Sequence, residues 1–91
     1  DAYVGIGMGA TDYKQPMKRP FPLAKIKVPV LDVYAANDFP AVKKMAVARW
    51  QSIEQAGNSK SAQVIVPDAD HYFTDRGAAL TSVISEWLDR L

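Results

Sequence analysis

Two side chains of this sequence have the types and the placement of a catalytic acid and its partner base. Asp38 follows a β-branched and aromatic run, and His71 follows the next such run along the chain. Ligands of open parallel sheets bind outside the carboxyl ends of the strands, so parallel pairing of these runs brings both side chains to one edge. There a carboxylate can hold one imidazole nitrogen and leave the other free to take a proton from a nucleophile. We therefore predict that Asp38 and His71 form a catalytic acid–base pair.

Less specific interpretations of the same segment remain open. A lone histidine near aspartates is more often a surface or hydrogen-bonded structural residue than a catalyst. Asp68, Asp70 and His71 share one tight turn, but their spacing matches no standard metal site, so we predict neither a metal nor a cofactor. Asp70 is better interpreted as a turn residue. Tyr72 and Phe73 either line a pocket beside His71 or cover the sheet.

Three segments have the composition of strands. Residues 2–8 form a short apolar run that ends in glycines, which indicates a buried strand leading into a turn. Residues 28–35 and 62–66 are stronger, and the second of these should end at Pro67. Residues 11–25 contain three prolines and are predicted to form a loop.

Two further segments have the periodicity of amphipathic helices. The first starts at residues 37–40, where a polar side chain precedes Pro40, and stops at Gly57. Its predicted packing face contains Val42, Met45, Ala46, Trp50 and Ile53. Its other faces, predicted to be solvated, contain Lys43, Lys44, Arg49 and Glu54. The second helix begins near Gly77, with an apolar stripe of Leu80, Val83, Ile84, Trp87, Leu88 and Leu91.

The order of these elements predicts the fold class. A helix between the two best strands is the crossover that parallel pairing requires. We expect an α/β fold with a three-stranded, mainly parallel sheet and flanking helices, as one domain or fragment over residues 1–91. Two helices cover only part of such a sheet, so another segment should cover or extend the remainder.

Composition excludes several classes of function. Hydrophobic residues make up 48% of the chain and the net charge is +1, so no strong positive field for nucleic acid exists. No apolar run reaches the roughly twenty residues of a membrane span. The absence of cysteine excludes a cysteine nucleophile but leaves cytoplasm and periplasm equally open. A first residue of Asp1 rather than methionine is typical of a processed or truncated product.

Two segments of the sequence resemble α/β-hydrolases. Residues 29–38 (Pro-Val-Leu-Asp-Val-Tyr-Ala-Ala-Asn-Asp) are similar to the strand and loop that deliver the family's triad acid, with Asp38 on the acid position. Residues 64–73 (Val-Ile-Val-Pro-Asp-Ala-Asp-His-Tyr-Phe) resemble its last strand and histidine loop, with His71 on the base position. The resemblance covers only the C-terminal portion of such a fold, and is closest to a poorly characterised branch of it.

The sequence departs from this family at two points. Ala35 stands where the family has glycine, and no Gly-x-Ser-x-Gly nucleophile motif exists in the chain. Residues 5–9 (Gly-Ile-Gly-Met-Gly) have the motif's outer glycines, with Gly7 at the nucleophile position. They are either a nucleophile turn that lost its serine or, our preferred interpretation, an earlier strand of the hydrolase sheet. No helix or acidic ligand follows them at the spacing of a dinucleotide site.

The resemblance implies a C-terminal hydrolase segment with the acid and base but no nucleophile, inactive alone. The parent activity would be serine-dependent ester or acyl hydrolysis, with the missing N-terminal segment as partner. The alternative is a non-enzymatic α/β module whose sheet edge pairs with a second copy to make a homodimer. A proteolytic remnant without a role of its own is a third possibility.

Overall fold

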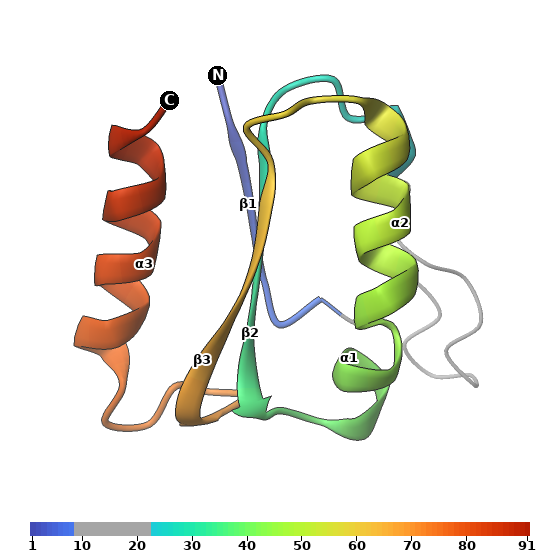
Figure 1. Cartoon of the computed structure of the whole chain (residues 1–91). Helices are drawn as coiled ribbons and strands as arrows, with labels where there is room; N and C mark the ends of the chain where they lie inside the picture. Colours follow the sequence, from blue (N-terminus) through green and yellow to red (C-terminus); the bar gives the residue numbers. More distant parts are fainter. Residues whose placement is uncertain (9–22) are drawn as a thin grey trace.

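The sheet of this protein is parallel and three-stranded. The computed structural model describes residues 1–8 and 23–91. The strands lie in the order β1 (Tyr3–Ile6), β2 (Val30–Asn37) and β3 (Ala62–Asp70), and both neighbouring pairs are parallel. Figure 1 shows α3 (Gly77–Asp89) on one face of the sheet, with α1 (Pro40–Lys44) and α2 (Ala46–Ala56) on the other. The predicted α/β class, with a parallel sheet between helices, is confirmed.

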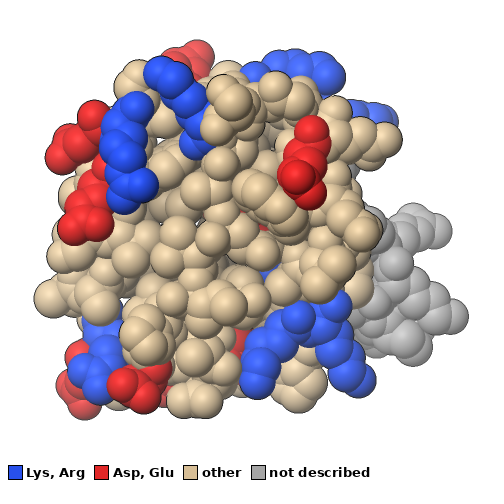
Figure 2. All heavy atoms as spheres, viewed as in Figure 1, with Lys and Arg blue, Asp and Glu red and all other residues tan. Residues whose placement is uncertain are grey.

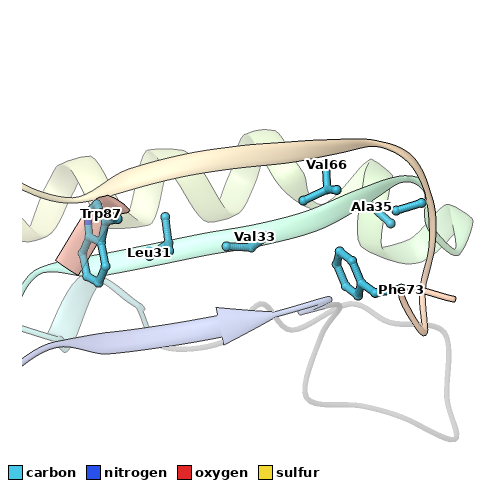
Figure 3. Packing of buried hydrophobic residues seen from close by; sticks show 7 residues of the cluster. Leu31, Val33, Ala35, Val66, Phe73 and Trp87 are labelled. Atoms are coloured by element: carbon cyan, nitrogen blue, oxygen red, sulfur yellow. The ribbon is translucent and has the colours of Figure 1, made fainter. Parts of the chain in front are cut away.

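The face of the sheet beneath α3 carries the larger hydrophobic cluster. Successive strand side chains point to opposite faces, so Leu31, Val33 and Ala35 of β2 all point toward α3. Figure 3 shows Trp87 of α3 beside Leu31 and Phe73 beside Ala35, at opposite ends of the cluster. The Trp87 indole N–H donates to the Lys60 carbonyl at 2.8 Å. The apolar stripe predicted for the last helix packs on the sheet through Leu80, Val83, Ile84 and Trp87. The prediction is wrong for the end of the stripe, because Leu88 and Leu91 are exposed.

The other face has smaller clusters under the α1–α2 segment. Met8, Leu23, Val30 and Ile53 are buried together, with Trp50 packed against them. Leu23 belongs to a single 3₁₀ turn, Leu23–Lys25, at the end of the predicted loop. The remainder of that loop prediction, residues 11–22, lies outside the described residues.

The helix predicted between the two strong strands is two helices. The chain leaves α1 at Met45, whose φ and ψ are −85° and −2°, and α2 ends at Gly57 in the left-handed region at φ +82°. Glycine takes that conformation without steric cost, which explains the predicted stop. The prediction that Arg49 lies on a solvated face is wrong, because its side chain is fully buried against the sheet.

Both outer strands differ in detail from the prediction. β3 continues through Pro67 to Asp70, because an edge strand tolerates a residue without an N–H group. β1 was expected to be buried, yet Tyr3 and Ile6 are 40% and 46% exposed. β1 is the other edge of the sheet, so none of the described residues pairs with its outer side.

In the view of Figure 2 the charged side chains lie in several small groups, mixed in sign on the left and mainly lysine or arginine at the lower right. Lysine, arginine, aspartate and glutamate gather near both ends of the sheet, and the middle of this face is uncharged. Within residues 1–8 and 23–91, no helix has the length and apolar character needed to cross a membrane.

Candidate acid–base site

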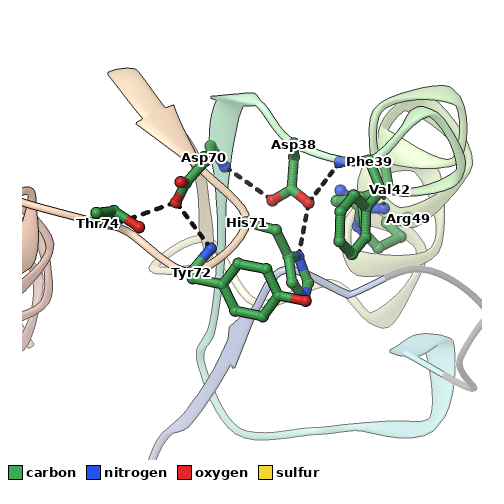
Figure 4. A network of polar contacts seen from close by, with 9 residues as sticks. Asp38, Phe39, Val42, Arg49, Asp70, His71, Tyr72 and Thr74 are labelled. Atoms are coloured by element: carbon green, nitrogen blue, oxygen red, sulfur yellow. Dashed lines mark hydrogen bonds and ion pairs between the residues drawn. The ribbon is translucent and has the colours of Figure 1, made fainter.

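The carboxyl ends of β2 and β3 bring together the two predicted site residues. Asp38 is the first residue after β2, and His71 is the first after β3. The Nδ1 atom of His71 lies 2.7 Å from Oδ1 of Asp38, as Figure 4 shows. The sequence therefore predicted this contact correctly, because two adjacent parallel strands end at one edge.

Asp38 is fixed by the backbone around it. Its side chain is fully buried. Oδ2 accepts a hydrogen bond from the Ala35 N–H at 3.1 Å, and Oδ1 accepts one from the Phe39 N–H at 2.8 Å. The expected capping of α1 by a polar side chain does not occur, since Phe39 is the N-cap residue and no side chain caps it. The carboxylate is instead directed at His71.

This contact determines the tautomer of His71. An ionised carboxylate only accepts hydrogen bonds, so Nδ1 must carry the proton that joins the two groups. In the neutral ring Nε2 is then left with a lone pair, and it makes no hydrogen bond to any described residue. The His71 side chain is 27% exposed, so part of the ring borders solvent.

Two aromatic rings hold the imidazole from other directions. Phe39 stacks on His71 with ring centroids 4.4 Å apart, and Tyr72 meets His71 edge-on at 5.2 Å. Sequence reasoning missed Phe39, although its place directly after Asp38 was the available signal. Tyr72 is 76% exposed, whereas Phe73 is buried in the cluster beneath α3. Of the two aromatic residues after His71, only Tyr72 borders the site, and Phe73 covers the sheet.

Gly7 of the glycine-rich segment lies against the same imidazole. It follows β1 in the left-handed region at φ +64°. A Cβ atom added to Gly7 would lie 2.8 Å from Cε1 and 3.0 Å from Nδ1 of His71. Only a residue without a side chain fits beside His71 at this position. Gly9, the last residue of the segment, lies outside the described residues.

Replacing Gly7 with alanine should displace His71 from Asp38. The left-handed conformation disfavours alanine by about 1–2 kcal/mol, and the added methyl group overlaps the ring. Because the chain has one histidine, its Nδ1 proton gives one low-field NMR signal, which should disappear in the variant. Gly57→Ala is the matched control, since Gly57 is also left-handed and its Cβ would meet nothing within 4 Å. An unchanged signal in Gly7→Ala would contradict this assignment of Gly7.

Asp70 is a turn residue, as the sequence suggested. Its Oδ1 accepts hydrogen bonds from the backbone N–H groups of Tyr72 and Thr74, both at 3.0 Å (Figure 4). The pKa of Asp70 is lowered below 3.8 mainly by the hydrogen bond from the Thr74 backbone, and to a smaller extent by one from the Thr74 side chain. No group of three potential metal-ligating side chains occurs among the described residues.

The Asp70 turn should make a pH-dependent contribution to stability. Because the pKa of Asp70 is lowered on folding, its contribution is fully present above pH 3.8 and is lost as the pH falls through the lower folded value. Asp70→Ala should therefore destabilise the protein at pH 7, and the difference from the parent should shrink as the pH falls below 3.8. Urea unfolding across this range measures it. A difference that stays constant with pH would contradict the prediction.

A buried polar network that sequence reasoning missed lies between the sheet and α2. The Arg49 Nε donates to Oδ2 of Asp32 at 2.8 Å, and both side chains are fully buried. Gln63 Nε2 donates to the same oxygen at 2.7 Å. The available signal was Asp32 itself, because an aspartate in the middle of an apolar strand requires a buried partner.

Two hollows among the described residues lie at the opposite end of the sheet from His71. One of about 290 Å³ is bordered by Trp50 and Ser61, and one of about 250 Å³ by Ser61 and Trp87. Ser61 directly precedes β3, whereas His71 directly follows it. The hollows therefore do not contribute to the acid–base pair, which lies on an open edge.

Comparison of the chain with protein-family models, with curated proteins and with solved structures gives no match. The site is a buried carboxylate in contact with a partly exposed imidazole at the carboxyl edge of a parallel sheet.

Proposed function

We propose that Asp38 and His71 are the acid and base of a serine-dependent acyl hydrolase whose nucleophile lies outside this chain. The observation that carries the proposal is the 2.7 Å contact from Nδ1 of His71 to a fully buried carboxylate, with Nε2 unpaired among the described residues in a side chain that is 27% exposed. The similarity of residues 29–38 and 64–73 to hydrolase acid and base loops supports it. The chain alone is expected to be inactive, because acid and base without a nucleophile lack the first step.

In the proposed reaction, His71 acts first as a general base and then as a general acid. Nε2 takes the proton from the incoming serine hydroxyl while the serine oxygen attacks the ester carbonyl. Asp38 stabilises the imidazolium through the Nδ1 contact. The imidazolium then gives the proton to the departing alcohol as the acyl–oxygen bond breaks. Water repeats the sequence on the acyl-serine, which releases the acid and restores the serine.

The outer edge of β1 is where the missing segment could join the sheet. Tyr3 and Gly7 donate their N–H groups to Pro29 and Val33 on the β2 side. Because backbone groups alternate in direction along a strand, the N–H and C=O groups of Val4 and Ile6 point away from β2. A further strand could pair there, on the side of the sheet where Gly7 already lies close to His71.

The test is to express the complete reading frame that encodes these residues and to assay short-chain p-nitrophenyl esters. We expect turnover, labelling of one serine outside this chain by a fluorophosphonate, and loss of both in a His71→Ala variant. The isolated 91-residue chain should hydrolyse the esters no faster than its own His71→Ala variant.

Two results would contradict the proposal. The first is a reading frame that encodes only these residues, because no nucleophile would then be supplied by the same protein. The second is turnover by the complete protein that His71→Ala leaves unchanged, since the base would then have no part in it.

A second candidate is a non-enzymatic module that pairs with its own copy through β1. Its specific support is the exposure of Tyr3 and Ile6 on a strand whose outer side pairs with none of residues 1–8 and 23–91. The opposite edge is less suitable, because Pro67 removes a donor from β3. Light scattering during size-exclusion chromatography separates the candidates: a mass of about 20 kDa favours self-pairing, and a mass near 10.0 kDa rejects it.

A further inference from the structure

The buried arginine of α2 connects two parts of the chain that flank Asp38. Besides the ion pair with Asp32 of β2, Arg49 donates from Nη1 to the backbone carbonyl of Val42 in α1 at 2.7 Å. Asp38 lies between Asp32 and Val42 in the sequence. One guanidinium group therefore bridges the strand before the acid and the helix after it.

The same network reaches the strand that carries the base. Gln63 of β3 lies opposite Asp32 in the parallel register. Its Nε2 donates both to Asp32 and to the Ala46 carbonyl of α2, at 2.7 and 2.9 Å. Both strands that end in the site are thus joined to the α1–α2 segment on this face.

The α1 helix needs such a connection more than an ordinary helix does. It has five residues, and its first turn has no side-chain cap. Phe39, directly before it, stacks on His71 and donates its N–H group to Asp38. A shift of α1 would therefore move both the stacking ring and a hydrogen-bond donor of the carboxylate.

We propose that Arg49 is a positioning residue that fixes the Asp38–His71 pair by clamping α1 to the sheet. The purpose of this clamp rests on the proposed hydrolase function, but its mechanical effect can be measured without any substrate. Arginine suits the position because it makes directed contacts from two nitrogens, and its Cζ also lies 5.2 Å from the Tyr34 ring centroid. The ammonium group of lysine cannot reproduce this geometry.

The test measures exchange with water of the Nδ1 proton of His71, the one histidine of the chain. The double variant Arg49→Met with Asp32→Leu removes the clamp and leaves no buried charge, so it can keep the fold. We expect the proton to exchange about tenfold faster or more than in the parent. Arg49→Lys keeps a charge beside Asp32 and should change the exchange rate in the same direction.

Arg76→Met is the matched control, because the Arg76 side chain makes one hydrogen bond to the described residues. That bond is exposed and runs from Nε to the Asp68 carbonyl at 3.1 Å. In the Arg76→Met variant, the exchange rate of the His71 Nδ1 proton should stay within about twofold of the parent. Dispersed amide signals from α3 establish that each variant is folded. An exchange rate within twofold of the parent in the folded double variant would overturn the proposal, and if that variant does not fold, Arg49→Lys decides by the same criterion.

Failure of this inference is distinguishable from failure of the proposed hydrolase. A change in proton exchange stands whether or not the complete protein hydrolyses esters. An unchanged exchange rate would remove the role of Arg49 and leave the ester assay unaffected.

Discussion

Replacing Arg49 with alanine should cost the protein about 3–5 kcal/mol of unfolding free energy, because the carboxylate of Asp32 would remain buried without its partner. Both side chains of this pair are fully buried. Small domains have only about 5–15 kcal/mol in total. Urea unfolding followed by circular dichroism measures the loss, and the midpoint of unfolding should move to a much lower urea concentration than in the parent.

Removing both charges should be far less damaging than removing one. Within the described residues, Oδ1 of Asp32 and Nη2 of Arg49 have no hydrogen-bond partner. The pair is therefore incompletely compensated, so Arg49→Met with Asp32→Leu should be close to neutral or stabilising. Arg90→Ala is the control, because Arg90 is 74% exposed in its 3.9 Å contact with Glu86. We expect Arg90→Ala to lose less than about 1 kcal/mol of unfolding free energy. If Arg49→Ala lost no more than Arg90→Ala, burial of the pair would not matter and the prediction would be wrong.

Changing Asp38 to asparagine should lower ester hydrolysis by the complete protein roughly 10⁴-fold. The asparagine amide can donate to Nδ1, which stabilises the tautomer with the proton on Nε2. That proton blocks the atom that accepts one from the serine in the proposed reaction. The expected loss is in kcat. Stability should also fall by about 1–3 kcal/mol, because an amide nitrogen that faces Nδ1 cannot accept the Phe39 N–H that Oδ1 accepts.

Asp75→Asn is the matched control for this charge removal. Asp75 lies in the loop after His71, is exposed, and has a positive φ of +57° that asparagine tolerates. The Asp75→Asn variant of the complete protein should hydrolyse esters at the same rate as the parent. A similar loss in both variants would show that loop charge, rather than the contact with His71, determines the rate.

The main features of the fold and of the candidate site could be predicted because they depend on local sequence. The β-branched runs around Val33 and Val64 determine two strands, and the helix between them makes those strands parallel. Asp38 and His71 directly follow the two strands. Their proximity is then a consequence of topology and requires no knowledge of side-chain packing.

The features that were not predicted depend on contacts between distant residues. Helical periodicity placed Arg49 away from the apolar stripe, but it could not show that Asp32 and Gln63 would meet it from two strands. The break at Met45 lies beside the same network, because the Val42 carbonyl just before it accepts a hydrogen bond from the guanidinium. The close approach of Gly7 to His71 likewise depends on the order of the strands in the sheet.

The parallel order of the sheet also has a kinetic consequence. Tyr3 pairs with Val30, and Leu31 pairs with Ala62, so every strand contact joins segments about thirty residues apart. No hairpin among the described residues can form first and serve as a local nucleus. Refolding should consequently be slow compared with a helical bundle of this length, and β2 must find both neighbours before either edge is stable. During that search the apolar β2 is unpaired, so aggregation on refolding should increase steeply with protein concentration.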